Sequence, residues 1–426
     1  MPVLSKKMET ECLQVGMYVS DIDRPWAETP FPLQGFHIKD SEHLRQVQHL
    51  CDWVKVDFQK SRHSINPSAA STTVSNFNAE PDEKNGREII NLRIRTIQNP
   101  APYRVSKRLT NELKIAQRVH RKVEVRINKI LGNFSTDGRL RVDQLKQVTA
   151  DLVESIIRHP DAFAYLSRMD NHHPSIFSYS VRVATWTVLA GRHLNIAKDV
   201  LSDLTIAAMM CKVGYISLPK MLFDAKGSRS PQEEEMLKAS LQQGVKTLQD
   251  TRDFSSRVIK IVSYHLERFD GSGYPRGVTG RHIPFLAQLV GLADYYESIT
   301  SYDFCDDPFA STDAIRELYR QRNASFDGHL IEEFIQAIGP YPTGTVVKLT
   351  DNQLAIVVEQ NPRARLRPKV VALEDTRRWW EFFKSPVIDL NKPLSERRIS
   401  ASLPPLPNNA ELKQIQFFKR ATSFSS

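Results

Sequence analysis

Residues 264–286, YHLERFDGSGYPRGVTGRHIPFL, restrict the possible folds more than any other stretch of this chain. A charged segment that ends a helical pattern runs there directly into a turn. Gly271, Gly273 and Gly277 relieve the backbone where a side chain would clash, and Pro275 fixes its own φ. Loops held by a rigid scaffold often carry function. Spacing alone therefore supports a functional loop and a structural turn with an incidental histidine equally well.

The composition is that of a globular chain with room for two or three domains, at 426 residues and 41% hydrophobic residues. The four cysteines (Cys12, Cys51, Cys211 and Cys305) lie far apart, which argues against a disulfide framework or a zinc knuckle and fits a reducing cytoplasm. Since no window of about 18 apolar residues exists, we expect a cytoplasmic protein without a membrane span. The net charge of +9 predicts a basic solvated surface, with nucleic acid, anionic lipid or a nucleotide as alternative partners.

The first 60 residues are expected to form a small α+β domain. Residues 17–19 and 53–57 have the pattern of strands, and residues 40–51 have helical spacing with Ser41 as a possible N-cap. Residues 61–100 are rich in Ser, Asn, Thr and Pro, which predicts a flexible linker.

Residues 101–142 are expected to form a connecting amphipathic helix, strongest over 106–132. Its apolar residues recur three or four apart, with Lys and Arg between them. We expect this helix to dock onto its neighbours or onto a second subunit, as in a homodimer. Nucleic acid and a membrane surface are the alternative partners of its basic face.

Three further regions complete the chain. Residues 143–340 are strongly helical, with Pro160 ending one helix and residues 198–214 apolar enough for a buried central helix. Residues 341–384 predict a short β extension, and the Pro- and Ser-rich residues 385–426 predict a loosely ordered tail. Further helices are expected at about 231–248, 254–266, 284–301 and 309–324.

The motif "ERFDGSGYPRG", followed by "LADYYESITS", resembles the signature of the HD-GYP family, bacterial metal-dependent phosphodiesterases that open cyclic di-GMP. The resemblance runs from about residue 160 to about 340. Residues 16–38 resemble the small domain that often precedes HD-GYP in one branch, and residues 341–362 resemble its short extension. It implies a multi-domain protein: an all-α helical domain of the HD superfamily, a small N-terminal α+β domain and a short C-terminal β extension.

The resemblance also implies a set of metal ligands, because hydrolysis of a phosphodiester needs a metal cluster that polarises phosphate and activates water. Position by position, only His265 and Asp294 remain as metal-ligand remnants. The other family ligand positions are substituted, by Tyr179, Cys211, Lys212, Ser240 and Leu266. We therefore predict no catalytic residues and expect no cofactor, with iron or manganese only if the site is rebuilt around His172, His173 or Cys211.

Lys212 stands where the family has the defining aspartate, and its ammonium repels cations. Because ligands are lost and a cation is gained together, we predict that Lys212 pairs with Asp294 and fills the cavity as a salt bridge.

The expected ligand surface is altered as well. Asp303, Asp306 and Asp307 follow "ITS", where the resemblance implies basic residues that meet phosphate. We expect this acidic stretch to weaken cyclic di-GMP binding, although Arg268, Arg276 and Arg281 stay basic near the loop.

Three functions are compatible with this pattern. The first is a degenerate, non-catalytic HD-GYP protein of signal transduction. Its interaction loop is Gly273, Tyr274, Pro275 and Arg276, and the resemblance implies GGDEF-domain diguanylate cyclases as partners. The second is a cyclic di-GMP phosphodiesterase, a metal-dependent phosphoric diester hydrolase, with a rebuilt site. The third is a receptor that binds the nucleotide without hydrolysing it. The missing ligands favour the first, a protein that is not an enzyme.

Overall fold

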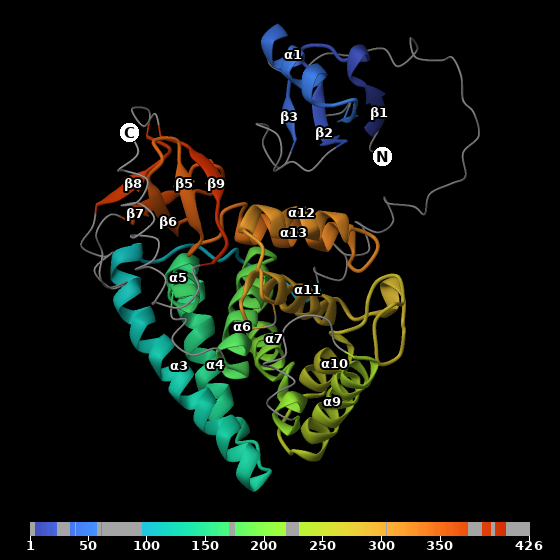
Figure 1. Cartoon of the computed structure of the whole chain (residues 1–426), viewed down its shortest axis with the longest axis vertical. Coiled ribbons are helices and arrows are strands. Elements are labelled where there is room, and N and C mark those ends of the chain that lie inside the picture. The colour runs from blue at the N-terminus through green and yellow to red at the C-terminus, as the bar shows by residue number, and fades with distance from the viewer. Residues whose placement is uncertain are drawn as a thin grey trace. The chain divides into compact units, whose positions relative to one another are not determined.

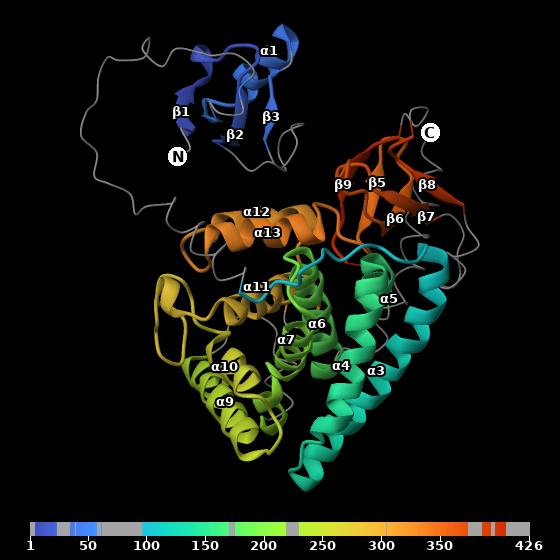
Figure 2. The same cartoon turned by 180° about the vertical axis from the view of Figure 1, so that it is seen from behind.

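The protein is described by a computed structural model over residues 5–23, 35–38, 40–57, 61, 96–169, 175–218, 230–303, 305–373, 386–392 and 397–405. The chain divides into two compact units, Met1–Glu83 and Lys84–Ser426 (Figures 1 and 2). Most of the predicted linker at 61–100, and residues 172 and 173 among the predicted substitute ligands, lie outside the described residues.

Over its described residues, the first unit is a four-stranded antiparallel sheet with one α-helix and a short 3-10 helix. The sheet has the strand order β1-β4-β2-β3. The helix begins after Asp40, whose side chain accepts a hydrogen bond from the amide of His43, so Asp40 and not Ser41 is the N-cap. The elements are β1 (Ser5–Glu9), η1 (Thr10–Cys12), β2 (Tyr18–Ile22), β3 (Phe36–His37), α1 (Ser41–Leu50) and β4 (Trp53–Asp57).

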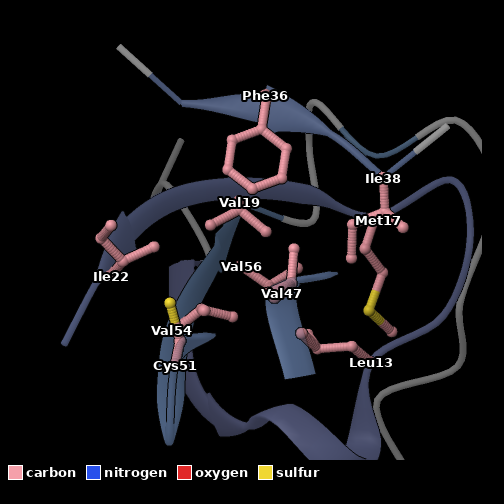
Figure 3. Close-up of a cluster of buried hydrophobic side chains, with 10 residues drawn as sticks. All are labelled: Leu13, Met17, Val19, Ile22, Phe36, Ile38, Val47, Cys51, Val54 and Val56. Atoms are coloured by element: carbon pink, nitrogen blue, oxygen red, sulfur yellow. The ribbon is translucent and has the colours of Figure 1, made fainter. Parts of the chain in front are cut away.

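The core of this unit lies between the helix and one face of the sheet. Alternate residues of β4 point into it, as the period of two in a strand requires, and Val47 of α1 meets them (Figure 3). This arrangement confirms the small α+β domain that the alternating pattern predicts. The buried cluster comprises Leu13, Met17, Val19, Ile22, Phe36, Ile38, Val47, Cys51, Val54 and Val56.

The second unit is mostly helical, as expected for the HD superfamily. Pro160 starts α5 rather than merely ending α4, because a proline fits the first turn of a helix, where its missing N–H is not needed. The helices are α3 (Leu109–Asp137), α4 (Val142–Arg158), α5 (Pro160–Met169), α6 (Ile176–His193), α7 (Lys198–Met210), η4 (Val213–Ser217), α9 (Pro231–Asp250), α10 (Ser256–Tyr264), η5 (Gly280–His282), α11 (Phe285–Thr300), α12 (Ser311–Arg320) and α13 (Gly328–Ile338).

Helix α7 lies inside the unit, with α6, α10, α4 and α11 packed against it. Among the described residues, the segment Lys198–Ser217 is long and apolar enough to span a membrane, but 78% of that window is buried within the unit. Its apolar character is therefore that of a core helix, as the sequence predicts.

A five-stranded antiparallel sheet, order β8-β7-β6-β5-β9, follows the helices. The prediction of a loosely ordered tail from residue 385 is wrong for the described part, because two of these strands come from it. β9 pairs with β5, and Ser402 shares a hydrogen bond of 2.7 Å with Thr312 of α12. The strands are β5 (Val346–Leu349), β6 (Leu354–Glu359), β7 (Lys369–Ala372), β8 (Val387–Asp389) and β9 (Ile399–Ser402).

Candidate functional site

The positions at which metal ligands are expected meet around Asp294. Helix α11 supplies Asp294, α6 supplies Tyr179, the end of α7 supplies Cys211 and Lys212, and the end of α10 supplies His265. Each of these five residues is buried.

Lys212 forms the predicted salt bridge with Asp294. Its Nζ lies 2.8 Å from Asp294 Oδ2, with 7% of Lys212 and 4% of Asp294 exposed. The hydroxyl of Tyr179 donates to the other carboxylate oxygen, Oδ1, at 2.9 Å. Both oxygens of the remnant carboxylate therefore accept hydrogen bonds from residues that replace family ligands.

The electrostatics of the site hold this pair charged. Burial is the largest effect on Asp294 and would raise its pKa, but the neighbouring positive charge and the hydrogen bonds from Lys212 and Tyr179 together lower it. Burial is likewise the largest effect on Lys212 and would lower its pKa, but Asp294 and the other neighbouring groups together raise it above the ordinary value. For Cys211, burial and the charge of Asp294 both raise the thiol pKa. Because the thiolate is the form that binds metal, a protonated Cys211 is a poor ligand.

His265 is neutral, and one of its ring nitrogens has no partner among the described residues. Its Nδ1 lies 2.8 Å from the carbonyl oxygen of Val262, whereas the buried Nε2 accepts or donates no hydrogen bond within the described ranges. Burial is the main cause that lowers the pKa of His265 to about 4, and Lys212 acts in the same direction. A Cβ on Gly291 would lie 2.1 Å from the carbonyl oxygen of His265, so a glycine is required there to let α11 approach the end of α10.

The residues present do not fit the metal cluster that the resemblance implies. No group of three or more His, Cys, Asp or Glu side chains suited to a metal occurs within the described ranges. Ser240 bonds to the carbonyl of Leu237 in its own helix, and Leu266 has no donor atom. The Lys212 ammonium contacts the carboxylate that a cation would need. These side chains therefore do not provide for a chemical step through a metal.

The loop after α10 is built around a buried acid, Glu267. Its two carboxylate oxygens accept the backbone N–H groups of Arg276 at 2.8 Å and Val278 at 3.1 Å, and only 2% of Glu267 is exposed. A Cβ on Gly273 would lie 2.2 Å from the backbone nitrogen of Arg268, so the turn requires glycine there. The Tyr274–Pro275 peptide bond is cis. Sequence spacing indicated this rigid turn but not the acid that holds it.

Tyr274, a member of the predicted interaction loop, is half-buried. Burial raises the pKa of Tyr274 to about 12. Within residues 273–276, Arg276 is the exposed side chain. Its guanidinium lies over the ring of Tyr264, 4.7 Å from the ring centroid, and it donates to the Tyr264 hydroxyl.

A buried ionic network beside the site was not predicted. Arg182 donates to Glu297 Oε1 at 2.5 Å and also to Asp303, while Trp186 Nε1 donates to Glu297 Oε2 at 2.7 Å. Asp303 is therefore a partner of Arg182 and not a free acid facing a ligand, which corrects its assignment to a repulsive stretch. Asp306 remains exposed.

Comparisons with protein families match two parts of the chain. The family described as HD domain matches residues 166–330, and the family described as domain of unknown function (DUF3391) matches residues 5–145. The first range contains every predicted metal-ligand position and the loop around Glu267.

Known proteins match over longer stretches. A cyclic di-GMP phosphodiesterase of Pseudomonas aeruginosa is 24% identical over 365 residues, 86% of this chain and 84% of that protein. The cyclic di-GMP phosphodiesterase PdeB of Borreliella burgdorferi is 28% identical over 187 residues, 43% of this chain and 49% of that protein. A solved structure described as an HDG"Y"P protein from Bdellovibrio bacteriovorus has a TM-score of 0.45 at 17% identity, over 78% of this chain and 98% of that one.

These matches correct the expectation that no cofactor is involved. The resemblance that they confirm is to phosphodiesterases that depend on metal, so a cofactor-free protein does not follow from the substitutions.

Proposed function

We propose that this chain, in which residues 166–330 match an HD domain and residues 5–145 match DUF3391, is an HD-GYP regulatory module of cyclic di-GMP signalling that does not hydrolyse the nucleotide. The observation that carries the proposal is the salt bridge of 2.8 Å between Lys212 and Asp294 at the centre of the family site. Removing one partner of a buried ion pair costs about 3–5 kcal/mol, so a competing cation must displace Lys212 against that penalty.

The described cysteines support a place for this module in the cytoplasm. Among the described residues, Cys211 and Cys305 are free thiols, as is usual in a reducing compartment.

The loop Gly273–Arg276 is the surface through which we propose that the module contacts its partner. Glu267 holds this loop in one conformation, so the loop loses little conformational entropy when a partner binds. Arg276 is exposed, and arginine is enriched among the hot-spot residues that contribute most of the binding energy at protein interfaces. GGDEF-domain diguanylate cyclases are the partner class that we propose.

A hydrolysis assay tests the absence of activity. Full-length protein is incubated with cyclic di-GMP and manganese or iron(II), beside the Pseudomonas aeruginosa relative as the positive control. We expect no linear or mononucleotide product from this chain. Turnover above the rate without protein contradicts the proposal and directs mutation to His172, His173 and Cys211.

Binding to purified GGDEF domains tests the partner class. We expect Arg276→Ala to weaken binding at least about tenfold, because truncating a hot-spot residue costs about 2 kcal/mol or more and arginine is enriched among hot spots. Lys260→Ala, at an exposed position of α10, is the matched control and is expected to bind like the wild type. Equal binding by both variants contradicts a role for the loop.

A receptor that binds cyclic di-GMP without cleaving it is the second candidate. The observation in its favour is that Arg182 neutralises Asp303, which removes part of the expected repulsion. Titration calorimetry with cyclic di-GMP separates the candidates, because the interaction module gives no binding heat whereas the receptor gives a saturable one.

A further inference from the structure

Nearly all of the excess positive charge of the chain lies in one segment. Residues 104–146 contain twelve Lys and Arg against four Asp and Glu, a net charge of +8 compared with +9 for all 426 residues. This segment comprises α3 and its approach, the turn after it and the start of α4. The basic balance of the protein is therefore concentrated and not spread over its surface.

The cations of α3 stand on the outward face of the helix. Its apolar residues, such as Ala116, Val123 and Ile127, are buried, and α3 packs against α4, α5 and α6. Docking onto neighbouring helices, as predicted from the sequence, thus uses the apolar face. The opposite face, which we call the basic face, is exposed along Lys114, Arg118, Arg121, Val125 and Lys129.

The charges of the basic face are not neutralised within the described part of the chain. Lys122, at the margin of this face, forms an ion pair of 2.5 Å with Asp151, but Lys114, Arg118, Arg121 and Lys129 form none with any described residue. The acids of α3 do not compensate for them. Glu112 is buried and bonded to Arg158, and Glu124 is only half-exposed.

The composition of the basic face distinguishes among anionic partners. A helix that enters a membrane needs an apolar face toward the lipid, and here that face is buried in the unit while Val125 alone is apolar outside. Protein interfaces have cores rich in aromatic residues and poor in charge, and this face has no aromatic side chain. Interfaces with nucleic acid are polar and strongly positive, and most of their contacts go to phosphates.

We propose that the basic face of α3 binds the phosphate backbone of duplex nucleic acid without reading its sequence. Lys114 and Lys129 are fifteen positions apart, which is about 22 Å along the helix. That length spans about six phosphates of one strand, at about 3.4 Å each. Four cations on a rigid rod can therefore each reach a phosphate. The proposal does not depend on the function of the Asp294 site.

Fluorescence anisotropy of the full-length protein with a random-sequence DNA duplex tests the proposal. The variant Lys114→Gln/Arg118→Gln/Arg121→Gln/Lys129→Gln removes the four cations. Its matched control, Lys246→Gln/Arg252→Gln/Lys260→Gln/Arg363→Gln, removes four exposed cations elsewhere and changes the net charge equally. All eight positions are exposed, so both proteins are expected to fold, and circular dichroism checks this.

We expect wild-type binding to weaken about 100-fold between 50 and 200 mM salt, as about four phosphate contacts require. The α3 variant is expected to lose this binding, and the control variant to keep it. Equal losses in both variants would show attraction by net charge alone and overturn the proposal, as would absence of binding to the duplex. Binding to vesicles of phosphatidylserine but not to DNA would overturn it in favour of a membrane partner.

Discussion

Residue by residue, the Asp294 site shows how a substituted charge acquires a partner. Lys212 and Asp294 are 82 positions apart, yet their salt bridge follows from the sequence because a lost aspartate and a gained lysine fall at one family position. The network of Arg182, Glu297 and Trp186 did not follow, since no quoted motif contains Arg182 or Trp186 and both lie more than 100 positions from Glu297. Pairings inside a motif are therefore predictable from sequence, whereas pairings outside it depend on packing.

Lys212→Ala is expected to destabilise the protein by about 3–5 kcal/mol, because it leaves the buried carboxylate of Asp294 without its counter-ion. Urea unfolding followed by circular dichroism measures the change. Lys246→Ala, at an exposed position of α9, is the control and is expected to stay within about 0.5 kcal/mol of the wild type. A Lys212 variant as stable as this control would show that the ion pair is not needed to keep the site closed.

The lowered pKa of the buried His265 predicts that the protein loses stability in mild acid. Its pKa is lowered from 6.5 to about 4 in the folded protein, so the unfolded chain binds the extra proton between these values. Unfolding free energy therefore rises with pH across this window, and falls by up to about 3 kcal/mol as the pH drops from 6.5 to 4.

The comparison of His265→Gln with wild type between pH 7.5 and 4.5 isolates this contribution. We expect a shallower pH dependence for His265→Gln, and an unchanged one for His282→Gln at an exposed position. Parallel curves for wild type and His265→Gln would contradict a neutral buried histidine.

Among the elements, helices with a clear apolar period were mostly located to within a few residues, and these include the short helices α10 and α12. The pattern at about 284–301 corresponds to α11 at Phe285–Thr300. Helix α13, with Asp327 capping its start, was missed although its cap and its apolar period are both present in the sequence. β9 was missed because a four-residue strand gains its stability from pairing with β5, about 50 positions earlier, and not from local propensity.

Two glycines in different elements are expected to respond oppositely to alanine. In η4, a Cβ on Gly214 would lie 1.8 Å from the carbonyl oxygen of Ser240, so Gly214→Ala forces η4 and α9 apart and costs about 1–3 kcal/mol. In α3, nothing lies within 4 Å of a Cβ on Gly132, and alanine there stabilises by about 0.5–1 kcal/mol. Thermal unfolding of the two variants measures whether each substitution lowers or raises the stability of the protein. Equal effects would contradict the close contact of η4 with α9.

At the scale of the whole molecule, the sequence predicted which kinds of domain are present. It did not predict that residues after 385 contribute strands to the C-terminal sheet. Both the small α+β domain and the helical HD domain were expected and are present. The C-terminal sheet is larger than the predicted extension, since β8 and β9 belong to it. A Pro- and Ser-rich composition shows only that a segment lacks local helical or strand periodicity. It does not show that a distant strand, here β5, can pair with the segment.

A chain that ends at residue 396 is expected to lose about 2–4 kcal/mol of stability and to self-associate, because β5 becomes an unpaired edge. A chain that ends at residue 405 keeps all five strands and is the matched control. Urea unfolding and light scattering compare the two proteins. A monomer of control stability after the shorter truncation would show that β9 is dispensable.

The pairing of β9 with β5 also sets an order of events on the ribosome. All strands of the first sheet lie within the first 57 residues, so that sheet has its full complement of strands early in synthesis. β5 must wait for about 50 more residues, which takes about 3–10 s at usual elongation rates. During that interval the nascent chain presents an open strand edge, to which a strand of another chain can pair.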